Sequence, residues 1–550
     1  MTVPEESLFA VLAAAEPSAP RRLGELIERL EASGRLRTVL PPSTPRSGVA
    51  GSEPALGALQ IRGVTYDSRH VRASSVFVAV PGVHADGHDF VAAAAAFGAA
   101  AAVVERPVPG AALPQIVVDD ARRALAIAAA WWYGDPSREL GVVGITGTDG
   151  KTTTSFLAAA VLEAGGISTG FITTAAAKVG GVRTANPEHV TTPEAPQLQR
   201  MLRAMVQAGN QAAVVETTSH GLALHRVAEI AYDVAIFTNL THEHLELHGT
   251  FEAYREAKLI LFHGLGGSGG GPAKRLVRPW PETAIVNADD SSAPLFVEAG
   301  RAAGARVITY GETDSADVRA THIEEGPRSL YVKVATPRWT GSLDLRLAGT
   351  FNAHNALACV ALGEALDLDR ALIGEGLAAV EGVPGRMERV DCGQPFGVVV
   401  DYAHSPGSLE KVLGVLAPMT SGGGGLIAVF GSAGERDVQK RPMMGRIAGE
   451  RCRLVVVTDE DPRGEDSGKI IAEIAAGAVA AGKTASRDLL CIADRRAAIE
   501  AAFERARAGD VVLLAGKGHE RTIITPDGPQ PWDERSEAVQ ALGRLGYESE

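Results

Sequence analysis

Short apolar runs alternate with longer stretches of helical periodicity along most of this chain, and the alternation begins at Ile61. In the middle of the chain the strand-like runs are 140–143, 212–215, 234–237 and 284–286. Further apolar strands follow at 396–400, 426–430, 454–457 and 511–514. Strands that alternate with helices are typical of parallel sheets whose faces are covered by helices. The pattern therefore predicts an α/β protein.

Breaks in this pattern divide the chain. Residues 1–55 carry a helical pattern from Leu23 to Leu30 among Pro, Ser and Arg residues but no chemical motif, so we expect an extension and linker there. The turn-rich sequence 131–136 indicates the end of a first domain at 56–138. A central domain at 139–385 and a C-terminal domain at 386–550 follow. This division suits a chain of 550 residues, which is too long for one core.

Composition limits the kinds of partner. The net charge of −13 argues against nucleic acid, because the mean field of the protein repels phosphate. Any anionic ligand must then be held by local groups. The cysteines lie far apart without metal-ligand spacing and are expected to be small core residues of a reducing compartment; they are Cys359, Cys392, Cys452 and Cys491.

No segment predicts secretion or a membrane span. The apolar stretch from Leu8 to Ala15 follows two glutamates, where a signal peptide would carry positive charge. The longest apolar run, 90–104, is mostly alanine and shorter than the ~20 residues that a span requires, so we expect a buried helix there. We therefore expect a cytoplasmic protein without a membrane partner, and we expect it to act as a monomer.

A glycine-rich turn follows the apolar run 140–143. Residues 144–152 read Gly-Ile-Thr-Gly-Thr-Asp-Gly-Lys-Thr and precede a helical stretch at 152–164. Glycines let backbone N–H groups and a helix N-terminus face a polyphosphate, while Lys151 adds a positive charge and Thr152 a hydroxyl ligand for Mg²⁺. The ordinary P-loop has glycine at 145, where this chain has Ile145. A turn that binds nothing is the alternative, but the Lys-Thr pair favours ATP binding.

Polar groups also follow other strands. Glu216 ends an apolar strand, where open parallel sheets place ligand groups, and it suits a Mg²⁺ ligand; a carboxylate in solvent is the alternative. Residues 238–248 follow the next strand and contain three histidines and two glutamates, which suggests metal or phosphate contacts. Their spacing lacks the helical H-E-x-x-H order of a zinc protease, so zinc-dependent hydrolysis is disfavoured.

The C-terminal block carries polar or glycine-bearing sequences after its strands. They are Arg386, Asp401 with His404, the run 431–437 with Arg436, the run 459–463, and the run 516–520. If these ends share one side of one sheet, they form a substrate crevice. A lone Gly-x-Gly such as 516–518 is by itself more typical of a plain turn.

Together these segments resemble the Mur ligases, most closely their UDP-N-acetylmuramoyl-tripeptide synthetase (MurE) type, from about residue 61 onward. The matching motifs are Asp67-Ser68-Arg69, Asp86-Gly87-His88, the loop 144–152, Thr191-Thr192-Pro193, Glu216 to His220 with Arg226, 239–249, Tyr254 to Lys258, Asn287 to Asp290, Gly349 to Asn355, Gly385 to Arg389, Asp401 to His404, and Gly516 to Glu520. The resemblance implies an N-terminal UDP-binding α/β domain, a central P-loop ATPase-like parallel sheet and a C-terminal Rossmann-like α/β domain for the incoming amino acid.

The resemblance also implies the residues of each site. The implied ATP contacts are Gly147, Thr148, Asp149, Gly150, Lys151, Thr152, Thr153, Asn287, Asp290, Asn352, Asn355, Arg386 and Asp401. The implied contacts of the UDP substrate are Ser68, His88, Thr191, Thr192, Thr218 and Arg226. The implied amino-acid contacts are Arg436, Asp461, Arg463, Gly516 and Glu520. The implied catalytic residues are Lys151, Glu216, His244, Lys258 and Arg386.

Two Mg²⁺ ions are implied, one at Thr152 and Glu216 and a second at His244 and a carbamylated Lys258. A lysine amine that has taken up CO₂ becomes a carboxylate-like oxygen ligand, which suits Mg²⁺. Without the resemblance, Lys258 would be interpreted as a helix-surface lysine.

The implied reaction is ATP-dependent amide-bond formation in peptidoglycan biosynthesis. A carboxylate is a poor electrophile, so ATP must phosphorylate the carboxylate of UDP-N-acetylmuramoyl-L-alanyl-D-glutamate, and the amine of a free diamino acid then displaces phosphate. Lys151, Arg386 and two Mg²⁺ ions would offset the repulsion between carboxylate and γ-phosphate.

Some positions depart from the family pattern. Asp149 stands where asparagine is common, Thr218 where serine is usual, and Leu224 where glutamine often contacts substrate. Asp461 stands where members that select diaminopimelate usually have asparagine before Pro-Arg.

These departures bear on the third residue of the peptide. Arg463 alone favours meso-diaminopimelate. A carboxylate at 461 beside Glu460 should instead repel a second substrate carboxylate and attract a terminal ammonium. We therefore favour ornithine or lysine narrowly over meso-diaminopimelate. The alternative is that Asp461 only caps a turn before Pro462.

Other functions stay open. Another Mur-type ligase would share most of these motifs. A P-loop kinase or GTPase would share the glycine-rich loop, but the sequence has no G-protein base-reading motif, and such a function leaves the C-terminal strand ends unexplained. A non-catalytic binding module would be expected to lack Lys151 or Glu216, and both are present.

Overall fold

The computed structural model of the protein describes residues 5–43, 56–82, 85–186, 190–241, 248–266, 273–276, 278–326 and 329–547. By its internal contacts the chain forms two compact units. The first consists of Met1–Arg319 with Leu357–Gly376, and the second of Ala320–Ala356 with Leu377–Glu550. Across the described ranges, no helix is both long and apolar enough to cross a membrane.

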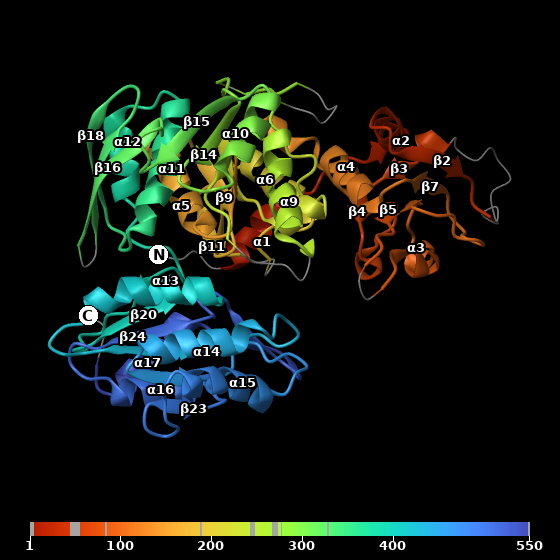
Figure 1. Ribbon diagram of the computed structural model, residues 1–550. Coiled ribbons are helices and arrows are strands. Elements are labelled where there is room, and N and C mark those ends of the chain that lie inside the picture. Colours follow the sequence, from red (N-terminus) through yellow and green to blue (C-terminus); the bar gives the residue numbers. More distant parts are fainter. Residues whose placement is uncertain are drawn as a thin grey trace. The chain divides into compact units, whose positions relative to one another are not determined.

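The N-terminal part of the first unit is a mainly parallel sheet with helices on both faces (Figure 1). Its strands lie in the order β2–β7–β6–β5–β4, with bounds Leu36–Leu40, Gln115–Val118, Ala101–Val104, Ser75–Val78 and Gly63–Thr65. Helices α2 (Leu23–Ala32) and α4 (Ala121–Tyr133) share one apolar core with this sheet. Helix α3 (Val91–Ala96) packs in a second core with alternate residues of the same strands. The α/β character predicted for this region is confirmed.

The N-terminal segment that we expected to be an extension and linker contains regular elements of the fold. Strand β2 pairs antiparallel with β7 and forms an edge of the first sheet. Helix α1 (Glu5–Ala14) places Leu8 and Leu12 in the core of the central sheet, farther along the chain. These roles depend on partners distant in sequence, so the local pattern did not indicate them.

The alanine-rich run 90–104 is not one helix, and that prediction is wrong. Helix α3 ends at Ala96, and the chain turns through Gly98, which has a φ of 92°. That left-handed conformation favours glycine because it lacks a Cβ atom. The chain then enters strand β6, whose residues are all buried. Alanine suits both a helix and the interior of a sheet, so apolarity alone does not distinguish them.

The central sheet of the first unit positions the glycine-rich loop. Its strands lie in the order β11–β10–β9–β12–β8–β13–β14–β15, with bounds Val182–Ala185, Ala176–Val179, Thr169–Ile172, Ala212–Glu216, Gly141–Thr146, Val234–Phe237, Thr283–Asn287 and Arg306–Gly311. From β9 to β15 neighbouring strands are parallel. Helices α6 (Ala195–Gln207), α9 (Phe251–His263) and α10 (Ala293–Ala302) share a core with these strands. The predicted P-loop ATPase-like parallel sheet is therefore confirmed.

The second unit contains the predicted Rossmann-like sheet, with helices on both faces (Figure 1). Its strands lie in the order β19–β20–β24–β21–β22–β23, with bounds Glu388–Arg389, Gly397–Asp401, Val511–Ala515, Leu426–Phe430, Leu454–Val457 and Leu489–Cys491. Helices α13 (Pro406–Leu416), α14 (Lys440–Arg451) and α15 (Ser467–Ala480) cover one face. Helices α16 (Arg495–Arg505) and α17 (Glu534–Arg544) cover the other.

The remaining elements are short or connect these layers. In and around the first unit they are β1 (Arg21–Arg22), η1 (Leu56–Ala58), β3 (Gln60–Ile61), η2 (Ser68–His70), η3 (Gly87–Phe90), η4 (Pro136–Arg138), α5 (Lys151–Ala164), α7 (Ser219–Ala223), β16 (Val318–Glu325), α11 (Phe351–Ala365) and α12 (Arg370–Ala378). In the second unit they are β17 (Leu330–Ala335), β18 (Thr340–Leu345), η5 (Ala417–Met419), β25 (Thr522–Thr525) and β26 (Gly528–Pro531).

The expectation that all cysteines lie in the core holds for three of them. Cys359, Cys392 and Cys452 are buried, and burial raises the pKa of Cys359 and Cys452. Cys491 is exposed, because it ends the edge strand β23.

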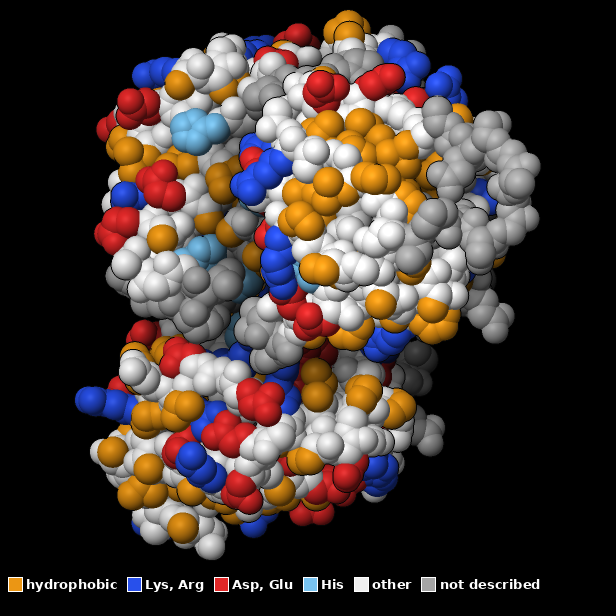
Figure 2. All heavy atoms as spheres, turned by 90° about the vertical axis from the view of Figure 1, so that its right-hand side faces the viewer, with side chains coloured by type: hydrophobic (Ala, Val, Ile, Leu, Met, Phe, Trp, Pro, Cys, Tyr) orange, Lys and Arg blue, Asp and Glu red, His pale blue; other side chains and the backbone are white. Residues whose placement is uncertain are grey.

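The surface carries charges of both signs. On the face drawn in Figure 2, acidic and basic side chains are interspersed, with hydrophobic side chains between them. With a net charge of −13, the protein as a whole does not attract polyphosphates. Local groups must bind such a ligand.

Candidate functional site

The glycine-rich loop joins the central strand β8 to helix α5 and adopts a conformation that depends on its glycines. Gly147 has a φ of 148°, and a Cβ atom there would lie 1.9 Å from Thr238 Oγ1. Gly150 has a φ of 83° and is the N-cap of α5, which begins at Lys151. The loop thus leads into a helix N-terminus, which favours anions because its first N–H groups lack helical partners. The strand–loop–helix arrangement that the sequence predicted is present.

The segment after β13 holds the loop from one side. Asn239 Oδ1 accepts a hydrogen bond from the Asp149 N–H at 3.0 Å, and Thr238 Oγ1 donates to the Asp149 carbonyl at 2.7 Å. Asn287 Nδ2 in turn donates to the Thr238 carbonyl at 2.7 Å, and Asp290 Oδ2 accepts from the Leu240 N–H at 2.7 Å. Asn287 and Asp290, which were predicted to contact ATP, therefore support the segment that holds the loop.

Other side chains of the loop make contacts within the loop and with neighbouring segments. Lys151 Nζ donates to the carbonyls of Gly147 and Thr148, at 3.1 and 2.7 Å, so its ammonium lies within the loop. Thr148 Oγ1 lies 3.2 Å from the Tyr254 hydroxyl and accepts from the Thr241 N–H. Thr152 and Thr153 are buried in the first turn of α5.

Glu216 lies beside the loop and is not a surface carboxylate. It ends β12, the parallel neighbour of β8, and only 1% of the residue is exposed. Its Oε2 accepts from Thr152 Oγ1 at 2.9 Å and from the Thr174 N–H at 2.9 Å, while Oε1 accepts from Thr174 Oγ1 at 3.0 Å. Such a buried carboxylate needs compensating donors or a cation. Thr174 was not predicted; the two threonines directly after β9 were the available signal.

Thr152 and Glu216 fit a Mg²⁺ ion by their chemistry. Both present oxygen atoms, and Mg²⁺ prefers oxygen ligands, commonly one or two protein groups together with phosphate oxygens. His244, which we predicted at a second ion, lies outside the described residues.

Lys258 is buried, contrary to what its sequence context alone indicated. It projects from α9 with 1% of the residue exposed, and its Nζ donates to the Gly147 carbonyl at 2.7 Å. The same nitrogen lies 4.4 Å from the centre of the Tyr254 ring. The lysine therefore contacts the glycine-rich loop directly.

The predicted substrate contacts of the central domain gather beside Glu216. Thr192 Oγ1 donates to the Glu216 carbonyl at 3.0 Å and lies 3.0 Å from Thr218 Oγ1. Arg226 donates to the Thr192 carbonyl at 3.0 Å and pairs with Glu194 at 2.6 Å. Thr191 Oγ1 lies 2.9 Å from Thr174 Oγ1, the same hydroxyl that donates to Glu216. Residues from two separate motifs thus lie together next to the loop.

The predicted UDP contacts of the first domain have structural partners of their own. His88 is 4% exposed; its Nδ1 lies 2.6 Å from Asp86 Oδ1, and its Nε2 accepts from the Glu105 N–H at 3.0 Å. A hydrogen bond from Arg106 is the main cause that lowers the pKa of Asp86, which keeps that carboxylate charged. Ser68 begins the short helix η2 and is half-buried. His88 therefore supports the backbone at residues 105 and 106, directly after strand β6.

The predicted ATP contacts of the second unit have structural partners, which include both backbone groups and side chains. Asp401 ends β20 and accepts from the N–H groups of Met387 and Ala403, both at 2.8 Å. The guanidinium of Arg386 lies 4.6 Å from the centre of the Tyr402 ring. On α11, Asn355 donates to Asn352 Oδ1 at 2.9 Å, and Asn352 donates to the Ala348 carbonyl at 2.7 Å.

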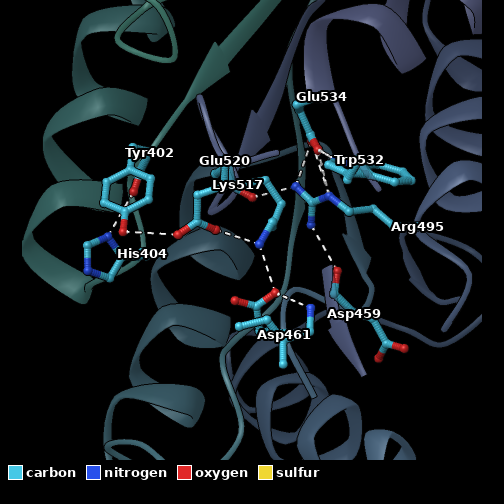
Figure 3. Close-up of polar contacts among 11 residues, drawn as sticks. Tyr402, His404, Asp459, Asp461, Arg495, Lys517, Glu520, Trp532 and Glu534 are labelled. Carbon is cyan, nitrogen blue, oxygen red and sulfur yellow. Dashed lines mark hydrogen bonds and ion pairs between the residues drawn. The ribbon is translucent and has the colours of Figure 1, made fainter. Parts of the chain in front are cut away.

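Two of the predicted amino-acid contacts, Asp461 and Glu520, are joined by Lys517 beyond the carboxyl ends of β22 and β24 (Figure 3). Asp461 Oδ1 accepts from Lys517 Nζ at 2.8 Å and from the Ile524 N–H at 2.9 Å. Lys517 Nζ also donates to Glu520 Oε2, and the Tyr402 hydroxyl donates to Glu520 Oε1 at 3.4 Å. Burial raises the pKa of Glu520, although the neighbouring Lys517 opposes that shift. Burial also raises the pKa of Tyr402, so it stays a donor.

Three further residues complete this edge. Gly516 has a φ of 102°, and a Cβ atom there would lie 2.8 Å from Glu460 Oε2. Arg463 is half-buried and donates its backbone N–H to the Ile524 carbonyl at 2.9 Å. Arg436 is exposed on the loop after β21. In the same loop, the Gly434 N–H donates to the Asp461 carbonyl at 2.8 Å. The five predicted residues therefore lie on segments that follow strands β21, β22 and β24.

The structure gives Asp461 a partner that the sequence did not indicate. We expected its charge to act directly on a substrate, but the residue is 6% exposed and is paired with Lys517, which is fully buried. Lys517 was not among the predicted site residues. Its only sequence signal was its place between two glycines after a strand, which is equally common in plain turns.

Comparisons with known proteins agree with this arrangement. The Mur ligase family catalytic domain matches residues 60–133, the Mur ligase middle domain residues 145–363, and the Mur ligase glutamate ligase domain residues 385–518. A UDP-N-acetylmuramyl-tripeptide synthetase of Roseiflexus sp. (strain RS-1) is 49% identical over 89% of this chain and 96% of its own length. A UDP-N-acetylmuramoyl-L-alanyl-D-glutamate–2,6-diaminopimelate ligase of Geobacillus thermodenitrificans (strain NG80-2) is 40% identical over 90% and 96%.

Solved structures show the same fold. A structure of a UDP-N-acetylmuramoyl-L-alanyl-D-glutamate–2,6-diaminopimelate ligase superimposes with a TM-score of 0.61 at 28% identity, over 90% of this chain and 98% of the other. A MurF ligase of Thermotoga maritima in complex with ADP has a TM-score of 0.57 at 20% identity, over 88% of this chain and 97% of the other. Mur ligases use ATP and Mg²⁺, which fits the loop and Glu216. The chain therefore belongs to the Mur ligase family and is an ATP-dependent ligase of peptidoglycan biosynthesis.

Proposed function

We propose that this protein is a UDP-N-acetylmuramoyl-tripeptide synthetase that acts in the cytoplasm. It joins a diamino acid to the D-glutamate carboxylate of UDP-N-acetylmuramoyl-L-alanyl-D-glutamate. The observation that carries the proposal is the contact between the nucleotide loop and the substrate surface, in which Glu216 binds Thr152 through its side chain and Thr192 through its carbonyl. The tripeptide synthetase at 49% identity supports the same activity.

The chemistry follows from the charges of the reactants. The substrate carboxylate attacks the γ-phosphorus of ATP, ADP leaves, and the resulting acylphosphate is attacked by the amine of the diamino acid, which releases phosphate. The first step brings two anions together. Lys151 lowers that repulsion at the β- and γ-phosphates, and we assign Arg386 the same role for the transferred phosphoryl group.

Mg²⁺ supplies charge neutralisation and orientation of the phosphates when it is bound. We assign one ion to Thr152 and Glu216, and a second to His244 and a carbamylated Lys258. The burial of Lys258 and its contact with Gly147 support its part in this assignment. Ser68 and His88, with Thr191, Thr192, Thr218 and Arg226, are proposed to form the site of the UDP substrate.

For the third residue we propose ornithine or lysine in preference to meso-diaminopimelate. Glu460 is 6% exposed, and its Oε2 has no hydrogen-bond partner among the described residues. A buried acceptor without a donor favours a ligand that donates, and an ammonium group does so with opposite charge. Arg436 and Arg463 can bind the α-carboxylate that every candidate carries. Relatives named for 2,6-diaminopimelate, such as that of Geobacillus thermodenitrificans at 40% identity, favour the other choice.

Replacing Asp461 by asparagine should change this preference. Lys517 would then neutralise Glu520 alone, so we expect kcat/KM for ornithine or lysine to fall by about tenfold relative to that for meso-diaminopimelate. The measurement compares kcat/KM for the three amino acids in wild type and variant. A wild-type preference for diaminopimelate, or an unchanged ranking in Asp461→Asn, would reject the charge argument.

The activity itself is tested by the requirements for ADP release. We expect release only when ATP, the UDP-N-acetylmuramoyl dipeptide and a free diamino acid are all present. A kinase or GTPase would hydrolyse or transfer phosphate without the amino acid, and a binding module would release no ADP. Another Mur-type ligase would require a different nucleotide-linked acceptor.

A further inference from the structure

A buried lysine joins the two acidic residues of the amino-acid site. In the ion pairs of Figure 3, the side chain of Lys517 has no exposed area, that of Asp461 is 9% exposed and that of Glu520 is 32% exposed. Of the three, Glu520 alone presents substantial area to a ligand. Asp461 and Lys517 lie behind it, so they act on a substrate through Glu520.

Arg495 joins the two segments that carry these residues. Arg495 on α16 donates to the Asp459 carbonyl at 3.1 Å and to the Ala515 carbonyl at 2.7 Å, at the ends of β22 and β24. Its guanidinium also pairs with Glu534, which accepts from Trp532 Nε1 at 2.6 Å. Both members of this pair are buried, so the spacing of the two strand ends is fixed by a fully paired group.

On that frame, Lys517 determines where the Glu520 carboxylate lies. One oxygen of Glu520 accepts from Lys517 and the other from the Tyr402 hydroxyl. Asp461, the second carboxylate that pairs with Lys517, is held in place by a hydrogen bond from the Ile524 N–H. Two carboxylates and one ammonium leave one net negative charge, and the exposed member of the group is Glu520.

We propose that Lys517 is a positioning and specificity-determining residue of the amino-acid site. It orients Glu520 toward the far amine of the diamino acid, and because Asp461 shares its charge, Glu520 keeps enough negative charge to bind an ammonium. This inference rests on the proposed function and deepens it. It differs from a direct role of Asp461 in that neither Asp461 nor Lys517 touches the substrate.

The test uses the full-length enzyme with ATP and UDP-N-acetylmuramoyl dipeptide, and measures kcat and KM for ornithine, lysine and meso-diaminopimelate. The variants are Lys517→Met, Lys517→Arg, and the double variant Asp461→Asn with Lys517→Met. The double variant carries the same net charge as wild type and avoids a buried carboxylate without its cation, so it remains informative if Lys517→Met does not fold. Lys469→Met replaces an exposed lysine on α15 and serves as the matched control.

Three results are expected if Lys517 positions Glu520. Loss of one charge-assisted hydrogen bond should raise the KM for ornithine or lysine by about tenfold or more in Lys517→Met, with the KM for ATP nearly unchanged. Lys517→Arg should recover part of this loss. The double variant should keep the wild-type order of the amino acids with a raised KM, since its charge is restored but its positioning contact is not.

Other results overturn the inference. In one, Lys517→Met changes the KM values for ATP and for the amino acid equally; in another, it leaves the amino-acid KM equal to that of the Lys469→Met control. Either result would show that Lys517 has no specific role in the amino-acid site. A reversed amino-acid order in the double variant would reject the charge balance. If the wild-type enzyme releases ADP without the UDP-N-acetylmuramoyl dipeptide, the proposed function fails. This outcome is seen in the wild-type enzyme alone, so it is distinguishable from a failure of the inference about Lys517, which appears only in the variants.

Discussion

Lys151→Ala should lower kcat for ADP release by roughly 10³-fold, which corresponds to about 4 kcal/mol in the transition state. The ammonium of Lys151 lies inside the glycine-rich loop, where it donates to the carbonyls of Gly147 and Thr148. A phosphate in this loop would take the place of those carbonyls as its partner. Alanine removes the positive charge at the β- and γ-phosphates, and no other loop side chain supplies one.

The fold should survive this substitution. Lys151 is only half-buried and belongs to the first turn of α5, where alanine is a good helix former. Circular dichroism and the thermal unfolding temperature should therefore match those of wild type. Lys178→Ala, at a half-buried lysine on strand β10 that pairs with Glu163, is the matched control and should keep full turnover. Near-normal turnover of Lys151→Ala would count strongly against the assignment of the loop.

The elements that sequence predicted well are those with local signals. The runs 426–430 and 454–457 coincide with strands β21 and β22, because buried parallel strands are continuous apolar segments. The helix after the glycine-rich loop begins one residue before the predicted start, at Lys151. Glycines with positive φ at 147 and 150 fix this turn by their own conformational freedom, so the sequence carries the information.

The elements that it missed depend on partners far along the chain. Thr174 joins the site because β9 lies next to β12, an adjacency that local periodicity does not encode. Lys517 contacts Asp461 across 56 residues of sequence. The same limit applies to β2, which is part of the sheet only because it pairs with β7, a strand distant in sequence. Strand-end motifs therefore predicted which polar segments lie near one another, but not which of their charges offset one another.

Lys258 shows both the use and the limit of a family resemblance. Its helical context indicates a surface residue, whereas the resemblance places it at the nucleotide, and in the structure it is buried against the loop. Burial of a lysine is costly unless its charge is compensated or converted. Carbamylation converts it, because the amine takes up CO₂, releases a proton and becomes an anion. That modification remains our proposal.

The corresponding prediction is that Lys258→Ala loses activity and regains part of it when short carboxylic acids are added. We expect kcat to fall by roughly 10³-fold, because the variant lacks an oxygen ligand for one Mg²⁺. Truncation of the buried side chain leaves space beside Gly147 and Tyr254, into which acetate or propionate fits with its carboxylate in place of the carbamate. The measurement is ADP release against carboxylate concentration, and saturation with a gain of at least about tenfold is expected.

Lys151→Ala is the control for this rescue. Its missing group is a cation, so carboxylates should not restore its activity, whereas a non-specific salt effect would raise both variants alike. A second measurement follows labelled bicarbonate into the wild-type enzyme, where incorporation should be lost in Lys258→Ala. An active wild-type enzyme in which Lys258 carries no label would reject the carbamate, and equal rescue of the two variants would reject its role as a metal ligand.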